Sequence, residues 1–224
     1  MTKFQIGTKP GHRAQEHLFV LKSIIALFNY YDQAVILQLY DISKFFDREH
    51  LRDAMDVLYS RGTRGKLYRL LYELNKNTIV KVKTAVGDTD EEDTGEGLGQ
   101  GTNEGALISA SSIDFTVNEQ FQNSPYEISY GDCYLQPLLF QDDIGRMTLT
   151  PEDAQMGNKK MESVMESKLL DFNLDKSCFM VIGNKKAQNV IQSKLDECPL
   201  TLCGTAMNSV KQEKYLGDQI CAAR

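Results

Sequence analysis

Apolar residues recur with two different periods along this chain, and the change of period separates predicted helices from predicted strands. A spacing of three or four over residues 14–31 predicts an amphipathic helix, and the nearly continuous apolar run 34–40 predicts a strand covered on both faces. Two helices should follow, the first capped by Asp47 and ending at Gly62. The second carries an apolar stripe made of Leu67, Leu70, Leu71 and Leu74.

In the middle of the chain, apolar and polar residues alternate with a shorter period. Residues 80–86 alternate apolar positions with Lys81 and Lys83, which predicts a strand with one polar face, then a turn at Gly87–Asp88 and an acidic return strand. A glycine-dense loop at 97–101 follows. The remaining predicted elements are a helix over 103–121, a hairpin over 131–149, a helix from 151, a strand over 177–183, a helix over 185–197 and a β-ribbon over 200–220. This order is typical of an α+β fold whose mostly antiparallel sheet is backed by helices on one face.

The stretch LLFQDDIG places two adjacent carboxylates, Asp142 and Asp143, between apolar residues. It predicts a tight hairpin with one strand ending near Phe140, a turn at the two acids, and a return strand from Ile144. Asp41 ends the apolar run 34–40, so neighbouring strands would bring three carboxylates to one rim of the sheet. Such a cluster repels itself, and oxygen ligands without His or Cys suit Mg²⁺ or Mn²⁺. Unrelated surface acids at strand ends are the alternative interpretation of this spacing.

Composition narrows the function classes. The chain has 224 residues, of which 42% are hydrophobic and 25% charged, as in ordinary globular proteins. Its net charge of −6 gives no support to a basic surface over the whole molecule, although a local basic groove is compatible with it. Five irregularly spaced cysteines and three histidines argue against a disulfide framework or a zinc site, and favour a reducing intracellular compartment, cytoplasmic or nuclear. No apolar run predicts a membrane span, and no signal peptide is evident.

Six segments resemble, in the right order, the sequence blocks of reverse transcriptases. QIGTKPGHRAQEHLFVLKSII resembles the second fingers block, YDISKFFD the D-x-x-K-x-F-D of palm motif A, and GLGQGTNEGALISA the glycine-rich motif B. LLFQDD resembles the [YF]-x-D-D of motif C, DFNLDKSCFMVIG motif D, and KQEKYLG motif E, the primer grip. Each segment alone is modest evidence, but six in register are highly specific. The chain is most similar to the enzymes of non-LTR retrotransposons.

The resemblance implies roles for the residues of motifs A and C. Asp41 and Asp142 would be the principal ligands of two Mg²⁺ or Mn²⁺ ions, helped by the carbonyl of Ile42, and Asp143 would be an accessory metal-binding acid at the primer end. The ring of Phe46 would lie under the sugar of the incoming nucleotide, where a 2′-hydroxyl would clash, so dNTPs would be favoured over rNTPs. Without the resemblance, Phe46 would be interpreted as a core aromatic at the start of a helix.

Other motif residues receive roles in the same way. Lys44 of motif A, with Gln100 and Gly101 of motif B, would bind the nucleotide, although a second register of motif B starting at Glu104 also fits. Lys176 matches a proposed general acid that protonates the departing pyrophosphate, whereas a lysine at a turn is more often simply solvated. The expected nucleic-acid contacts are Lys9, Arg13, Lys81, Lys83, Tyr215, Leu216 and Gly217.

The implied reaction is attack of a primer 3′-hydroxyl on the α-phosphate of a dNTP, with an RNA template and a DNA primer as partners. The implied fold is an α+β polymerase palm with an antiparallel sheet backed by helices, plus part of the fingers, the thumb being absent. The expected divisions are 1–31 partial fingers, 32–60 palm with motif A, 61–100 a fingers/palm helix and hairpin, 101–200 palm with motifs B to D, and 201–224 the motif E ribbon. The first fingers block also lacks a counterpart, so we expect a fragment of a longer polyprotein with weak activity alone.

Two other function classes stay open at the sequence level. A reverse-transcriptase-like module without activity would serve as a scaffold or bind RNA, and such modules usually lose the metal-binding acids that are present here. An RNA-dependent RNA polymerase would more often have glycine before the acid pair and a small or polar residue in place of Phe46.

Overall fold

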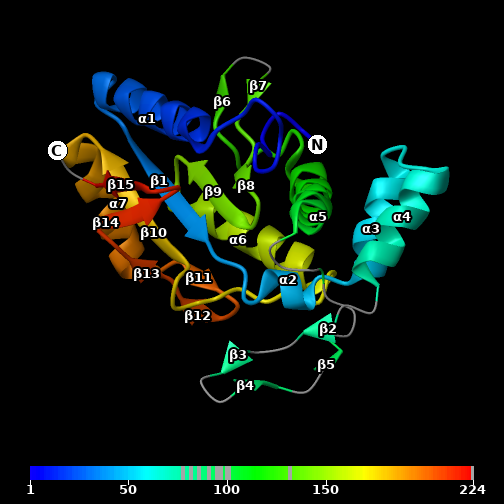
Figure 1. Cartoon of the computed structure of the whole chain (residues 1–224). Helices are drawn as coiled ribbons and strands as arrows, with labels where there is room; N and C mark the ends of the chain where they lie inside the picture. Colours follow the sequence, from blue (N-terminus) through cyan, green and yellow to red (C-terminus); the bar gives the residue numbers. More distant parts are fainter. Residues whose placement is uncertain are drawn as a thin grey trace.

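A five-stranded sheet forms the centre of the molecule (Figure 1). The structure is a computed structural model that describes residues 1–76, 79–80, 83–84, 87–89, 92–93, 98, 102–130 and 133–222. In spatial order the strands are β13 (Asn208–Ser209), β10 (Cys178–Gly183), β1 (Ala34–Tyr40), β9 (Asp143–Thr148) and β8 (Leu138–Phe140). The pairs are antiparallel except β10–β13, which is parallel. The predicted central strand and the β8–β9 hairpin are therefore confirmed.

The strand β1 is central because both of its faces are apolar. All seven of its residues are buried, and alternate side chains enter two separate hydrophobic clusters. Helices α5 (Asn103–Phe121), α6 (Pro151–Glu166) and α7 (Lys185–Glu197) cover one face. Helix α1 (Ala14–Tyr30) and the ribbon of β14 (Gln212–Tyr215) and β15 (Asp218–Cys221) cover the other. The expectation of helices on one face only was wrong, because a strand with two apolar faces requires cover on both.

The region after β1 departs from its predicted boundaries. Asp47 does not cap the next long helix but lies within the short helix α2 (Phe45–Arg48), and α3 (Leu51–Ser60) begins after His50. Gly62 follows the end of α3 with a φ of +100°, as expected of a glycine that ends a helix. Helix α4 (Gly65–Asn75) is present, but three of its four stripe leucines are more than half exposed: Leu67, Leu70 and Leu74.

The remaining strands form short pairs. Strand β2 (Ile79–Val80) pairs with β5 (Glu92–Asp93), and β3 (Lys83–Thr84) pairs with β4 (Gly87–Asp88). Gly87 and Asp88 therefore start the return strand and are not the turn itself. The predicted ribbon over 200–220 is divided, because β11 (Thr201–Leu202) pairs with β12 (Thr205–Ala206) while β13 joins the main sheet. The last pair is β6 (Ser129–Tyr130) with β7 (Cys133–Tyr134). Among the described helices, none is both long and apolar enough to cross a membrane.

Candidate active site

Asp41 is positioned by the segment that precedes β10. Its backbone N–H donates a hydrogen bond to the Ser177 hydroxyl over 3.1 Å, and its carbonyl accepts one from the Asn173 N–H over 2.8 Å. The next residue, Ile42, is buried and forms an isolated antiparallel bridge with Phe172. Hydrogen bonds therefore hold the backbone at Asp41 and at the residue after it, so the carboxyl group of Asp41 projects from a well-supported position at the end of β1.

The second pair of acids lies at the tip of the β8–β9 hairpin. Phe140 pairs with Asp143, so the turn consists of Gln141 and Asp142, and Asp143 is the first residue of β9. The predicted turn was one residue too late. Gln141 has a φ of +58°, in the left-handed region that two-residue hairpin turns require at their first central position.

The register of the sheet brings the three acids to one edge. Tyr40 pairs with Ile144, so Asp41 leaves β1 beside Asp143 and the turn that carries Asp142. Burial and the negative charge of Asp41 raise the pKa of Asp142. Burial, then Asp142 and Asp41, raise the pKa of Asp143 to about 6. The three carboxylates therefore repel one another through a partly dehydrated edge.

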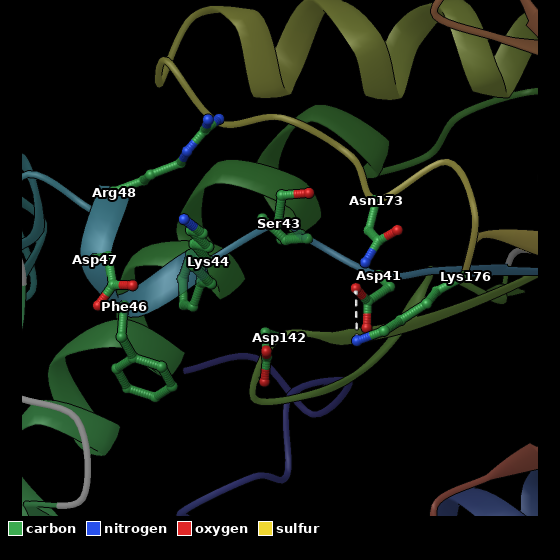
Figure 2. Close-up of a pocket in the computed structure, with 11 residues that line it drawn as sticks. Asp41, Ser43, Lys44, Phe46, Asp47, Arg48, Asp142, Asn173 and Lys176 are labelled. Atoms are coloured by element: carbon green, nitrogen blue, oxygen red, sulfur yellow. Dashed lines mark ion pairs between the residues drawn. The ribbon is translucent and has the colours of Figure 1, made fainter. Parts of the chain in front are cut away.

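Lys176 is the cation that meets these acids. Its Nζ lies 3.8 Å from Oδ2 of Asp41, although the lysine side chain is 68% exposed. Figure 2 shows Asp41 and Asp142 on the same side of a pocket, with the Lys176 amine beside the Asp41 carboxyl. The ammonium therefore offsets part of the negative charge at the edge without removing it, as the raised pKa values of Asp142 and Asp143 indicate.

The donor set fits a divalent cation only in part. Within the described residues, no three or more His, Cys, Asp and Glu side chains come close enough together to hold a metal ion. The three acids share an edge without forming such a cluster, and the carboxylate of Asp41 is paired with Lys176. Mg²⁺ needs only one or two carboxylates when substrate phosphates and water complete its shell. The half-buried pair Asp41 and Asp142 meets that requirement in chemistry.

A cavity of about 630 Å³ opens in front of Asp41 and Asp142 (Figure 2). Its wall comes from the stretch after β1, from the hairpin tip and from the segment before β10. The lining residues are Asp41, Ile42, Ser43, Lys44, Phe45, Phe46, Asp47, Arg48, Asp142, Asn173 and Lys176. A cavity of this size admits a nucleotide-sized ligand. It brings together Asp41, Ile42, Lys44, Phe46, Asp142 and Lys176 from the predicted set.

Five residues that line this cavity were not predicted as site residues, namely Ser43, Phe45, Asp47, Arg48 and Asn173. Arg48 is exposed on the last turn of α2 and forms an ion pair with Asp171. Asn173 holds the Asp41 carbonyl and lines the same cavity. The signal for Arg48 was its position two residues after Phe46, on the helix that motif A opens. Nothing in the local pattern distinguished Asn173 from an ordinary loop residue.

The ribbon β14–β15 lies on the other side of the acids. Tyr215 is 5% exposed, and its hydroxyl lies so close to β9 that a Cβ added to Gly145 would be 2.8 Å from it. Burial, with the nearby charge of Asp143, raises the pKa of the phenol. Leu216 and Gly217 form the turn between the strands. A second cavity of about 580 Å³ separates the ribbon from the acids. A nucleic-acid contact by these three residues stays a prediction.

Several predicted contacts remain outside this geometry. Lys81, Gln100 and Gly101 lie outside the described residues, and the side chain of Lys83 in β3 is not described. Lys9 is half-buried before α1, and Arg13 is exposed at the N-cap of that helix. The roles of these six residues stay predictions.

Comparison with known proteins supports the fold. No protein-family model matches the chain, and no curated protein sequence matches it significantly. Telomerase from Candida albicans, in complex with a TWJ fragment of telomeric RNA, is similar with a TM-score of 0.61 and 11% identity, over 94% of this chain and 33% of that one. Apo telomerase from Candida tropicalis, truncated from its C-terminal domain, gives 0.58 and 11%, over 98% and 39%.

The chain therefore spans about a third of the length of these telomerases. Telomerase is a reverse transcriptase, and the likeness confirms the predicted α+β fold of a reverse-transcriptase palm and fingers. It does not distinguish the enzymes of non-LTR retrotransposons from other reverse transcriptases.

Proposed function

We propose that this chain is the palm and part of the fingers of an RNA-directed DNA polymerase, which adds dNTPs to a primer 3′-end. The observation that carries the proposal is the set of repelling carboxylates at one sheet edge, which faces a nucleotide-sized cavity on a reverse-transcriptase fold. Perturbed acids in a cleft are a common mark of a functional site. The motif order adds the preference for DNA synthesis on an RNA template.

The acids and the metal have defined roles in this proposal. Asp41 and Asp142 would hold two Mg²⁺ or Mn²⁺ ions, with the Ile42 carbonyl and Asp143 as accessory groups. When bound, the ions supply positive charge to the attacking primer oxygen and to the departing pyrophosphate. The raised pKa values of Asp142 and Asp143 support this role, because a cation relieves the repulsion that raises them.

In this proposal, the basic side chains and the aromatic ring at the cavity bind the incoming nucleotide. Lys44 and Arg48 are exposed at its wall, where they would bind the triphosphate oxygens. Lys176 would leave Asp41 and donate a proton to the pyrophosphate. Phe46 is partly buried against the core and lines the cavity, where its ring would exclude a 2′-hydroxyl.

The wider assignment rests on the motifs. We propose an origin in a non-LTR retrotransposon polyprotein, with further fingers and thumb segments outside this chain and the RNA template and DNA primer as partners. The division into fingers, palm and primer-grip ribbon follows the motif positions. Activity of the chain alone would be weak, since other segments would complete the grip on nucleic acid.

One observation favours a second candidate, a non-catalytic module that binds RNA or serves as a scaffold. The carboxylate of Asp41 is already paired with Lys176, and the described residues hold no three-acid metal cluster. In such a module the lysine would permanently take the place of the metal.

Primer extension separates the two candidates. The chain is given an RNA template with an annealed DNA primer, Mg²⁺ or Mn²⁺, and either dNTPs or rNTPs. The proposal expects metal-dependent dNTP incorporation that Asp142→Asn abolishes and that Asp196→Asn, an exposed change on α7, leaves intact. RNA binding without incorporation supports the module. Incorporation that is unchanged in Asp142→Asn contradicts the proposed role of Asp142. A preference for rNTPs contradicts the role of Phe46.

A further inference from the structure

The segment before α1 lies beside the strand that leads to Asp142. The Leu139 N–H donates to the Phe4 carbonyl over 2.9 Å, and the Ile6 N–H donates to the Leu139 carbonyl over 3.2 Å. Gln5 therefore forms a parallel bridge with Leu139 at the edge of β8. These bonds bring a remote part of the chain to within reach of the acid-bearing turn.

The side chain of Gln5 binds that turn directly. Its Oε1 accepts hydrogen bonds from the N–H groups of Gln141, over 3.1 Å, and Gly7, over 2.9 Å. Its Nε2 donates to the Gln141 carbonyl over 3.1 Å. One fully buried amide thus satisfies both backbone groups of the residue before Asp142. Gln141 is held in the left-handed region, which residues other than glycine seldom adopt.

Gly7 allows this close approach. A Cβ added to Gly7 would lie 2.4 Å from the backbone nitrogen of Gln141 and 2.9 Å from its Cγ. Any larger residue would therefore push the segment away from the turn. Gln5 and Gly7 together form a clamp on Gln141, hereafter the Gln5 clamp.

The position of the clamp suggests its purpose. Gln141 is followed by Asp142 and Asp143, and the sheet register brings Asp41 to the same edge, so Gln141 lies at the start of the segment that carries two of the three acids. We propose that Gln5 is a positioning residue, which holds the Gln141–Asp142 turn so that Asp142 stays on the wall that it shares with Asp41. The link to metal binding rests on the proposed function, whereas the clamp itself does not.

The chemistry of the clamp selects glutamine. A glutamate in its place keeps the length and the acceptor but loses the donor to the Gln141 carbonyl, and it places a fourth carboxyl beside the acids. An alanine leaves the N–H and the carbonyl of Gln141 without these partners. Gln5→Ala and Gln5→Glu are therefore two independent ways to open the clamp, and the second keeps its volume if the first does not fold.

Hydrogen exchange tests the clamp without any metal. The exchange rate of the Gln141 amide, followed by NMR, should rise about five- to tenfold in Gln5→Ala, because the bond from this amide to the Gln5 side chain is lost. It should also rise in Gln5→Glu, because loss of the bond to the Gln141 carbonyl and the added negative charge loosen the turn that carries this amide. The matched control, Gln15→Ala, alters an exposed glutamine of α1 and should change nothing at the turn. An unchanged Gln141 rate in both variants overturns the clamp.

Mn²⁺ binding tests the positioning. The affinity of the folded chain for Mn²⁺, followed by electron paramagnetic resonance, should fall about tenfold in Gln5→Ala, as is usual when a group that orients a ligand is removed. Gln5→Glu is not used here, because its added carboxylate would itself attract the cation. Gln15→Ala should keep the wild-type affinity. Faster exchange with an unchanged Mn²⁺ affinity overturns the positioning role. If the wild-type chain binds Mn²⁺ no better than Asp142→Asn, the proposed function is overturned instead. The hydrogen-exchange result then still tests whether Gln5 holds the turn.

Discussion

Two residues of strand β9, only three positions apart, have opposite electrostatic surroundings. At Arg146, a guanidinium with no solvent exposure is fully matched: it bonds to the Glu127 carboxylate over 2.7 Å and to the Gln38 side chain over 2.8 Å. It also lies against α6, where a Cβ on Gly157 would be 2.0 Å from it. At Asp143, by contrast, carboxylates meet carboxylates, and the pKa rises to about 6.

The difference separates structure from function within a single hairpin. The Arg146 guanidinium bonds to Glu127, to Gln38 of β1 and to the Asp153 carbonyl of α6, so its donors have partners inside the fold, although burial still raises the pKa of Glu127 to about 7. Like charges at a cavity edge weaken the fold unless a cation arrives. The first arrangement joins neighbouring elements; the second is the feature on which the proposed cation site rests.

The largest effect on stability is expected at the matched end. Arg146→Met should lower the free energy of unfolding by about 3–5 kcal/mol, because it leaves the buried Glu127 carboxylate without its partner. Urea unfolding measures the loss. The exposed Arg52→Met on α3 is the control and should change stability by less than about 0.5 kcal/mol. A loss at Arg146 no greater than that of the control would contradict the structural role.

The next largest effect is expected on the choice between dNTPs and rNTPs, at the cavity beside the acids. Phe46→Ala should reduce the preference for dNTPs over rNTPs by roughly 10- to 200-fold, the range that steric exclusion in a pocket provides. Single-nucleotide incorporation kinetics with each substrate measure it. Phe19→Ala, which removes a ring that is 72% exposed on α1, should leave the preference unchanged. A preference that survives Phe46→Ala would assign the selectivity elsewhere.

Removing one repelling charge should stabilise the chain. The folded pKa of Asp143, about 6, exceeds its ordinary value of 3.8, so the folded state holds this proton more tightly than the unfolded state. The stability that protonated Asp143 provides is present below pH 4 and is lost as pH rises through 6. Although Asp143 is partly dehydrated at the sheet edge, its side chain still reaches solvent, which screens the charge, so Asp143→Asn should add only about 1 kcal/mol at pH 8.

Unfolding curves at pH 8 and at pH 4 measure this difference. The gain from Asp143→Asn should vanish at the lower pH, where the wild-type carboxyl group is protonated. A gain that is equal at both values would show that electrostatic repulsion is not its source.

The smallest effect is expected at Tyr215, behind the acids. Its buried hydroxyl has no hydrogen-bond partner among the described residues, so Tyr215→Phe removes no bond and should change stability by less than about 0.5 kcal/mol. Thermal unfolding in metal-free buffer measures it. A loss of more than about 1 kcal/mol would reveal a partner for the hydroxyl, such as a buried water.

Periodicity predicted the frame of the site well. The run 34–40 is apolar at every position except Gln38, so only a strand covered on both faces suited it, and Asp41 had to emerge at its end. The turn of the hairpin was placed to within one residue, whereas its first strand begins at Leu138 and not near residue 131. The error at its turn arose because Gln141, not an acid, adopts the left-handed conformation, and no local pattern marked it.

Residues whose roles depend on distant partners were not predictable. Gln5 reads as a polar residue in a turn-rich segment, yet it is buried against a turn 136 residues away. Arg146 reads as a polar position of a strand, yet it is matched by Glu127 and Gln38 inside the core. For α4 the error was the opposite one, because residues predicted to be buried are exposed. An apolar stripe predicts a helix, but it does not identify the surface against which the helix packs.

Thermal unfolding with Mn²⁺ tests the central claim most directly, that the acid edge is a cation site. A ligand that binds the folded state raises the melting temperature, and Mn²⁺ at about 100 times its Kd should raise that of the wild type by roughly 5 °C. Asp142→Asn should lose most of this rise, whereas Asp196→Asn on α7 should keep it. Equal rises in all three proteins, or none in the wild type, would contradict the account.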